Sequence, residues 1–271
     1  MNTPEGHLVY LYCVTAEPPE LRLVKDPSSA LDTVCEAGLC AVVSRVDACE
    51  FGESNLRRNL DDLSWVAAET TNHERIIEAI MRNHCVIPFR FATLFKTDDS
   101  LRSQLRAHGG QFRALLEQVD HKAEWGVKAY CDFDKLERDI HDGESTASGV
   151  DQAICSTSPG KAFLLGKKRR ETTKAAVADR AGCYAEQIVQ ALQPVSVQTR
   201  TTELMPEGEA EGYGAMILNA AFLVRNGDAR AFVDATNALA ERYAGTGIFI
   251  ECSGPWPPYN FCDLAKAAMD A

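Results

Sequence analysis

The sequence lacks long apolar runs. No apolar stretch approaches the roughly 18 residues of a membrane-spanning helix, and the amino-terminal MNTPEGHLVYLYCV has no basic segment ahead of its short apolar run. A secretory signal would need such a basic leader. We therefore expect neither a transmembrane helix nor a signal peptide, and we expect a cytoplasmic protein.

Paired metal-binding cysteines are also missing. Ten cysteines are scattered along the chain, but no C-x-x-C motif occurs. The nearest approaches are Cys35 with Cys40 and the adjacent His84 and Cys85, and neither is followed by a second ligand pair at zinc-finger distance. Without an export signal, we expect the cysteines to be free, small, buried residues. The sequence indicates no metal site and no cofactor.

No catalytic motif is complete. The stretch CSTSPGKA fails as a phosphate-binding P-loop, because Cys155 replaces the first glycine and Ala162 replaces the Ser or Thr that binds magnesium. It also fails the C-x5-R pattern of cysteine phosphatases, since Lys161 stands where an arginine would bind phosphate. No H-E-x-x-H or G-x-S-x-G motif is present. The neighbouring His73 and Glu74 are explained by a buried hydrogen bond as well as by catalysis. Because no candidate catalytic site remains, we expect that the protein is not an enzyme.

An excess of positive charge is missing as well. The chain has 28 basic and 39 acidic side chains and a net charge of -11, which disfavours non-specific attraction to nucleic acid or to an anionic membrane. What the chain has is an ordinary globular composition, with 45% hydrophobic and 25% charged residues. Single domains usually have about 100 to 200 residues. With 271 residues, two domains are expected.

The first half of the chain alternates between strand and helix signals. Short β-branched and aromatic runs predict strands, and apolar positions three or four residues apart predict helices. We expect strands at 7–14, 39–46, 85–95 and 124–133, a helical region at 54–83 broken around ETTNHE, and a helix at 101–119 interrupted at Gly109 and Gly110. This order predicts an α+β domain over residues 1–140, with helices on one face of a largely antiparallel sheet, as in ferredoxin-like folds.

The second half begins with a polar segment. HDGESTASGVDQ is rich in Gly and Ser and predicts a linker or mobile loop over 141–158. Beyond it we expect a long helix at 159–192, strands at 195–204, 213–226 and 247–254, and a helix at 228–244. Residues 159–271 are therefore predicted to form a smaller α+β domain with a tail rich in proline and aromatic residues.

The start of the long helix carries the basic run GKKRRETTK at 166–174. Such a run is most often a solvated helix face, and the alternative is a docking surface for an acidic protein. Nucleic acid is a weaker alternative, because interleaved aromatic residues and a global positive charge are both missing.

The tail contains CSGPWPPYNFC, from Cys252 to Cys262. Its prolines fix their own φ and favour extended conformations before them, and its aromatic rings offer large apolar area. A ligand cage would need converging polar groups, which this stretch barely supplies. We expect a packed corner that lays the C-terminus on the second domain, with Trp256 buried and the two cysteines unpaired; the alternative is a partner-binding surface.

Four segments, in order, resemble the gas vesicle L/F accessory proteins (GvpL/GvpF): VIPFRFATLF at 86–95, LLEQVDHKAEWGVKAY at 115–130, GKAFLLGKKRRE at 160–171 and GPWPPYNF at 254–261. The resemblance implies two α+β domains and a role in assembling gas vesicles, hollow shells built mainly from one small hydrophobic protein. It also implies this shell protein and other gas vesicle accessory proteins as partners, and a location in the cytoplasm or on the gas vesicle. Ala92 departs from the family, which commonly has glycine there.

Residues of these segments are candidate partner-binding or motif residues, and none is a candidate catalytic residue. Arg90 and Lys128 are cations inside strand segments, and Glu124 is expected to pair with Lys128 because it lies four residues away on the same side of a strand. The candidates are Phe89, Arg90, Phe91, Glu124, Trp125, Lys128, Lys167, Lys168, Arg169, Arg170, Trp256 and Tyr259. The resemblance implies binding of the main shell protein during gas vesicle assembly and leaves retention in the vesicle open. The alternative is a small-molecule-binding or enzymatic α+β protein unrelated to gas vesicles.

Overall fold

The computed structural model describes residues 6–24, 30–145, 159–204 and 214–262, with the backbone alone at 23, 141–145 and 159–171. The chain divides into two compact units, a first unit of Met1–Glu124 with Pro255–Ala271 and a second unit of Trp125–Gly254. Each unit carries helices and one sheet, which confirms the α+β class.

The predicted domain bounds differ from this division. The predictions of 1–140 and 159–271 remain predictions, and the first unit here also includes the end of the chain. Of the predicted linker 141–158, residues up to Ser145 belong to a helix, and the rest lies outside the described residues.

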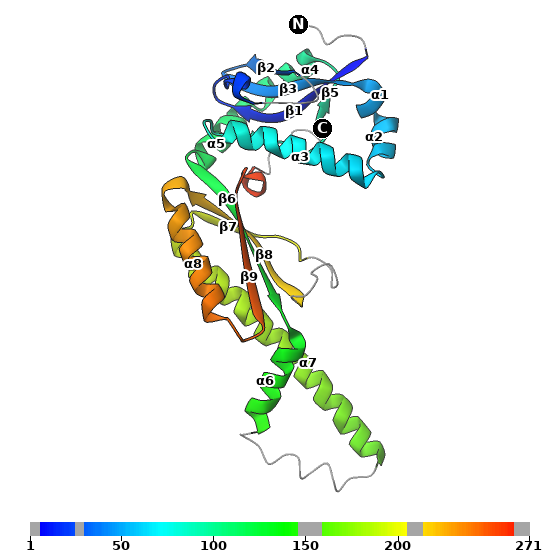
Figure 1. The fold of residues 1–271 in the computed structure, drawn as a ribbon, viewed down its shortest axis with the longest axis vertical. Helices are drawn as coiled ribbons and strands as arrows, with labels where there is room; N and C mark the ends of the chain where they lie inside the picture. Colours follow the sequence, from blue (N-terminus) through cyan, green and yellow to red (C-terminus); the bar gives the residue numbers. More distant parts are fainter. Residues whose placement is uncertain (1–5, 25–29, 146–158, 205–213, 263–271) are drawn as a thin grey trace. The chain divides into compact units, whose positions relative to one another are not determined.

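The first unit is built on a five-stranded sheet with β1 in its centre (Figure 1). The strand order is β2-β3-β1-β4, β5 also pairs with β1, and these pairings are antiparallel. The strands are β1 His7–Thr15, β2 Leu31–Glu36, β3 Leu39–Asp47, β4 Ile87–Pro88 and β5 Leu94–Phe95, and the helices are α1 Ala48–Phe51, α2 Glu53–Asn59, α3 Leu63–Met81, α4 Asp98–Ala107 and α5 Gly109–Val119. The predicted strands 7–14 and 39–46 are confirmed.

Helix α3 covers one face of this sheet. Tyr10 and Tyr12 of β1 form a buried cluster with Ile76 and Ile77 of α3. Arg45 follows Ser44, the partner of Tyr10 in the sheet, and therefore points to the opposite face, where its guanidinium bonds Asp98 at the start of α4. The helices thus lie on both faces, whereas the prediction placed them on one.

Three local predictions are corrected. Strand β2 was missed, because LDTVCE is a short edge strand with charged residues at both ends and a weak alternation signal. The predicted strand 85–95 is divided into β4 and β5 by a turn in which Ala92 has φ 59°. The helix break falls at residues 60–62, where Asp62 caps α3 by accepting from the amides of Ser64 and Trp65, and α3 runs unbroken through ETTNHE.

A tight hairpin joins β2 to β3. Ala37 and Gly38 both have positive φ, 53° and 72°, which is the pattern of a type I′ turn and matches the twist of the strands. Cys35 and Cys40 lie opposite each other and form a disulfide, so the expectation that all cysteines are free is wrong for this pair. No disulfide forms at the other described cysteines, as predicted, but Cys49 and Cys183 are exposed rather than buried; these cysteines are Cys13, Cys49, Cys85, Cys131, Cys183, Cys252 and Cys262, and Cys155 lies outside the described residues.

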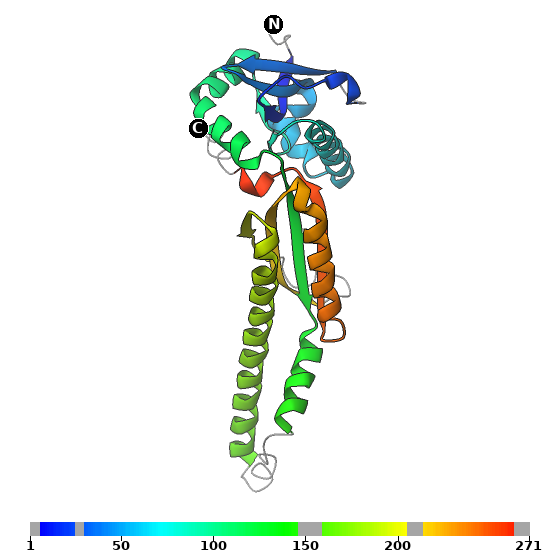
Figure 2. The same ribbon diagram turned by 90° about the vertical axis from the view of Figure 1, so that its left-hand side faces the viewer.

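The second unit is built on a four-stranded sheet of order β7-β8-β6-β9. Its elements are β6 Lys122–Cys131, α6 Phe133–Ser145, α7 Pro159–Leu192, β7 Gln198–Thr201, β8 Ala215–Arg225, α8 Ala229–Arg242 and β9 Ile248–Trp256. Helices α7 and α8 lie side by side and share one buried cluster with β6 and β8 (Figures 1 and 2). Among the helices of the described residues, none is both long and apolar enough to cross a membrane.

Candidate functional site

Residues of three family-like segments are joined by hydrogen bonds in the first unit: Phe89 of 86–95 bonds His73 of α3, Tyr259 of 254–261 bonds Glu74, and Asn260 bonds Glu124 of 115–130. We call this group the motif cluster; it consists of Tyr10, Tyr12, His73, Glu74, Phe89, Phe91, Glu124, Tyr259 and Asn260. Asp62 fixes the start of α3, and the helical spacing then turns His73, Ile76, Ile77 and Ile80 toward β1. His73 is thus placed in the core by the same apolar stripe that packs the helix.

Both ring nitrogens of His73 are used by the fold. Nε2 lies 2.9 Å from the backbone oxygen of Phe89, which can only accept, so Nε2 carries the proton. Nδ1 then accepts from the Tyr10 hydroxyl at 3.0 Å, and that hydroxyl accepts from the amide of Ala92 at 2.9 Å. Burial lowers the pKa of His73 to about 4, so the imidazole is neutral at pH 7. A general base would need a free nitrogen, and neither nitrogen is free.

Aromatic rings surround the imidazole. The Tyr12 ring stacks on it with ring centroids 5.5 Å apart and an interplanar angle of 28°. Phe91 meets the imidazole edge-on at 6.1 Å and also contacts Trp65 at 6.0 Å. These contacts connect the turn between β4 and β5 to α3 and give the cluster a largely apolar surround.

The tail docks on this cluster through two polar anchors. The Tyr259 hydroxyl donates to Oε1 of Glu74 at 2.9 Å. Burial raises the pKa of Glu74, and this hydrogen bond opposes the rise by stabilising the carboxylate. The carboxylate of Glu124 accepts from the backbone amide of Asn260 at 2.8 Å and from its side-chain amide at 2.5 Å. Residues 136 or more positions apart in the chain are therefore held together by carboxylates that are half-buried or buried.

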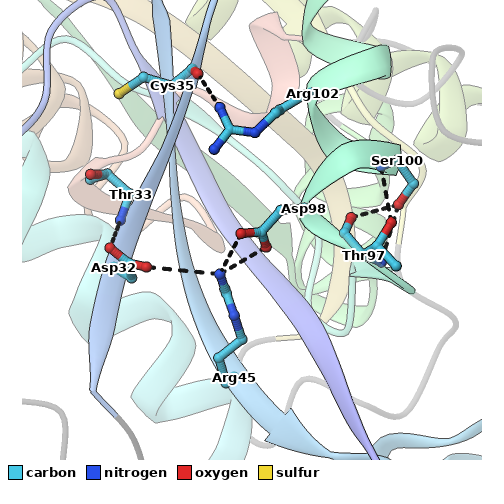
Figure 3. Close-up of polar contacts among 8 residues, drawn as sticks. All are labelled: Asp32, Thr33, Cys35, Arg45, Thr97, Asp98, Ser100 and Arg102. Carbon is cyan, nitrogen blue, oxygen red and sulfur yellow. Dashed lines mark hydrogen bonds and ion pairs between the residues drawn. The ribbon is translucent and has the colours of Figure 1, made fainter. Parts of the chain in front are cut away.

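A second polar group lies on the opposite face of the first sheet (Figure 3). Nη2 of Arg45 lies 2.7 and 2.9 Å from the two carboxylate oxygens of Asp98 and 3.8 Å from Asp32. Thr97 and Ser100 form a capping box that starts α4 and so positions Asp98. The capping residues TDDS gave the signal for the helix start, but nothing in the sequence indicated Arg45 as the partner.

The described residues form two hollows of note. One, of about 240 Å³, lies between the first sheet and helices α1 and α3 and is lined by polar groups that include Glu50, Asn72 and His73. Glu50 accepts from the indole of Trp65 at 2.8 Å, so this carboxylate already has a structural partner. The other, of about 440 Å³, lies in the second unit between α7 and the β7–β8 pair. Among the described residues, no group of three His, Cys, Asp or Glu could hold a metal ion.

Comparison with known proteins decides the family. The model of the gas vesicle synthesis protein GvpL/GvpF family matches residues 8–263. The chain belongs to this family. The resemblance seen in the sequence is thereby confirmed.

Relatives of both family branches are similar to the chain. Gas vesicle protein L of Streptomyces sp. (strain CB03234) is 28% identical over 229 residues, covering 84% of this chain and 81% of the relative. Gas vesicle protein F of the same strain is 26% identical over 249 residues, covering 91% and 93%. The crystal structure of GvpF from Anabaena sp. PCC7120 matches with a TM-score of 0.73 and 17% identity, covering 94% of this chain and 98% of that one, and so shares its fold.

The motif residues of this GvpL/GvpF chain are mostly interior. Phe89, Glu124 and Trp125 are buried, Phe91, Lys128 and Tyr259 are half-buried, and Arg90 and Trp256 are exposed. Trp125 belongs to the core of the second unit, where its ring lies 6.0 Å from Phe232. Lys167, Lys168, Arg169 and Arg170 lie on α7, and their side chains are outside the described part of the structure.

One prediction about these residues is corrected. Trp256 is 41% exposed rather than buried, because the chain leaves the second unit after Gly254 and the corner is filled instead by Pro257, Pro258 and Phe261. The division into units assigns the tail to the first unit, whereas the predicted bounds, which remain a prediction, assign it to the second domain. Glu124 accepts from Asn260, a residue that strand spacing does not indicate, and its expected pairing with Lys128 remains a prediction.

Proposed function

We propose that this GvpL/GvpF family member is an accessory protein of gas vesicle assembly that binds the main hydrophobic shell protein directly. The observation that carries the proposal is the family match over residues 8–263, which supports a role in gas vesicle synthesis. The shell protein is the proposed partner because an unassembled apolar chain exposes surface that must be covered to prevent non-specific association. Other gas vesicle accessory proteins are further partners in this proposal.

The proposed role is not enzymatic. The titratable pair that stands out in the sequence, His73 and Glu74, is engaged in holding β1, the β4–β5 turn and the tail together. An imidazole with both nitrogens bonded and a lowered pKa supports a structural role for this pair.

Arg90 and Trp256 are the proposed contact residues. Among the eight motif candidates whose side chains the structure describes, these two are exposed. Trp256 stands between Pro255 and Pro257, which restrict the backbone, so little conformational entropy is lost when a partner covers the ring. Tryptophan and arginine are also the residues most enriched among those that dominate binding energy.

Co-expression with the shell protein tests the proposal. A tag on this chain should recover the shell protein at low and moderate salt, and Trp256→Ala and Arg90→Ala should each reduce recovery. Phe249→Ala is the matched aromatic control, since Phe249 is 42% exposed on β9 in the second unit. Arg57→Ala is the matched charge control, since the Arg57 side chain is 78% exposed on α2.

The two parts of the proposal fail separately. If the wild type recovers no shell protein while both chains are soluble, direct binding is wrong. If the wild type recovers it and all four variants do so equally, binding stands and the proposed contact residues are wrong.

We further propose that the chain is retained as a minor component of the vesicle. Gas vesicles collected by flotation and washed at high salt should contain this chain when probed with a specific antibody. Its presence in the cytoplasmic fraction alone would contradict retention and would favour a chaperone that acts before assembly.

A further inference from the structure

The β2–β3 hairpin carries a disulfide at its tip. Cys35 and Cys40 are directly paired positions, with their Cα atoms 4.1 Å apart, and the turn residues Ala37 and Gly38 lie between them. The two sulfurs are therefore brought together by the strand register itself, before any bond forms. This placement distinguishes the pair from cysteines that a disulfide must pull together.

The hairpin is held by contacts that do not involve sulfur. Arg102 donates to the carbonyl oxygen of Cys35 at 2.6 Å (Figure 3), and Arg113 donates to the carbonyl oxygen of Ala37 at 2.8 Å. Arg106 pairs with Glu36 at 3.0 Å. The three arginines project from α4 and α5 and secure the edge strand and the turn.

The bond adds little constraint to this arrangement. It closes a loop with a sequence separation of 5, and a short loop removes less entropy from the unfolded chain than the long loops that structural disulfides usually close. Together with the arginine contacts, this means that the hairpin can keep its geometry with the bond open. A disulfide that the fold does not need can be reduced and re-formed without unfolding the protein.

The two cysteines differ in exposure. Cys35 is exposed, whereas Cys40 is 5% exposed. In Figure 3 the Cys35 sulfur points away from the Arg102 guanidinium, so that group does not cover it. By contrast, burial raises the pKa of the Cys131 thiol to about 11 and that of Cys13 further, which makes these thiols unreactive.

We propose that Cys35 and Cys40 form a reversible thiol–disulfide site that exchanges with a thiol or dithiol reductant through the exposed residue Cys35. A reductant thiolate attacks Sγ of Cys35, the Cys35–Cys40 bond breaks, and Cys40 leaves as a thiolate that takes a proton from water. A second thiol of the reductant then attacks the mixed disulfide and releases Cys35. The protein gains two electrons and two protons, and the reductant becomes a disulfide.

This site is independent of the proposed function. It requires neither the shell protein nor Arg90 and Trp256, so the two proposals can fail separately. Its substrate class is a cellular thiol such as glutathione or a dithiol protein.

Exchange of the full native chain with glutathione, followed by alkylation, tests the site. The chain is equilibrated with oxidised or reduced glutathione, quenched in acid, labelled with maleimide and digested with trypsin; the peptide 26–45 contains both cysteines and no internal Lys or Arg. We expect no label on this peptide after oxidation and two labels after reduction, when exchange with glutathione takes place without denaturant and labelling follows in denaturant, so that the buried Cys40 is reached. Cys49, exposed and in no disulfide, should carry a label after reduction, and after oxidation it should carry a label or a glutathione adduct, whereas the intramolecular bond in 26–45 adds neither mass.

Single variants test the direction of attack. In Cys40→Ser, a glutathione mixed disulfide should accumulate on Cys35. In Cys35→Ser, glutathione should react with the buried Cys40 at least about tenfold more slowly than it reacts with Cys35 in Cys40→Ser. The oxidised and reduced forms of the wild type should melt within about 4 °C of each other.

Three results would overturn the proposal. The first is two labels on peptide 26–45 after treatment with oxidised glutathione, which would mean that no bond forms. The second is reduction of the bond by glutathione only in denaturant. The third is a melting temperature that falls by much more than about 4 °C on reduction, which would mean that the disulfide is structural.

Discussion

Replacing Tyr259 by Phe removes the hydroxyl that anchors the tail to the first unit; this hydroxyl also lies 3.4 Å from Nε2 of His73. The Tyr259 hydroxyl donates to Glu74 at 2.9 Å, and the ring packs against the buried cluster around His73. Phe keeps the ring and removes the donor. A hydrogen bond to a charged group contributes about 1.5 to 3 kcal/mol. Because both side chains are half-buried and water can replace part of the lost bond, we expect a loss of about 1 to 2 kcal/mol.

The loss should depend on pH in a direction that the structure fixes. The bond stabilises the Glu74 carboxylate, and it opposes the rise in pKa that burial causes. Tyr259→Phe therefore raises the pKa of Glu74 further above its unfolded value. The folded variant then takes up its proton at higher pH than the wild type, so the destabilisation is full at about pH 7.5 and shrinks as the pH falls toward about 5.

Urea unfolding followed by circular dichroism at both pH values measures this effect. Tyr243→Phe is the matched control, because the Tyr243 hydroxyl donates at the same distance, 2.9 Å, to the uncharged Gln187. Its loss should not depend on pH. The reasoning is refuted if Tyr259→Phe is as stable as the wild type at pH 7.5, or if its loss is as independent of pH as that of Tyr243→Phe.

Three further predictions concern the first unit. Burial holds the pKa of His73 at about 4, below the unfolded value of 6.5, so the free energy of unfolding should fall as the pH drops from about 6.5 to about 4. In denaturant titrations, His73→Gln should remove on the order of 3 kcal/mol of that loss. The same pH profile in His73→Gln and wild type would contradict this. Ala92→Gly should stabilise the protein by up to about 1 kcal/mol, because Ala92 has a left-handed φ of 59°, and a lower melting temperature would contradict it. Trp256→Ala should lower the free energy of unfolding by less than about 1 kcal/mol and Phe261→Ala by about 3 to 5 kcal/mol, since Trp256 is 41% and Phe261 1% exposed. A larger drop in melting temperature for Trp256→Ala than for Phe261→Ala would contradict this.

Local patterns predicted most of the regular elements. The strands at 7–14 and 39–46 and the interruption of the helix near Gly109 are confirmed, because β-branched runs and helix-breaking residues act over a few positions. The break near ETTNHE was misplaced, because this polar stretch stays helical when His73 is bonded to Tyr10 and Phe89. Tertiary contacts of this kind override local propensity.

The motif cluster could be predicted only in part. The sequence identified three of its segments by family likeness, and it offered a buried hydrogen bond as one explanation of His73, which the structure bears out. The contact of Glu124 with Asn260 joins residues 136 positions apart, and no periodicity reports such a pair. The same holds for the exposure of Trp256, since the path of the chain after Gly254 depends on where the tail docks.

Deletion and complementation of this gene in a gas-vesicle-forming host tests the central claim most directly. The deletion strain would be supplied with the wild type, Trp256→Ala or the control Phe249→Ala, each expressed at the same level, and vesicles would be counted by electron microscopy. We expect no vesicles without the gene, full restoration by the wild type and by Phe249→Ala, and poor restoration by Trp256→Ala. Vesicles of normal number and shape in the deletion strain would contradict a role for this chain in gas vesicle assembly.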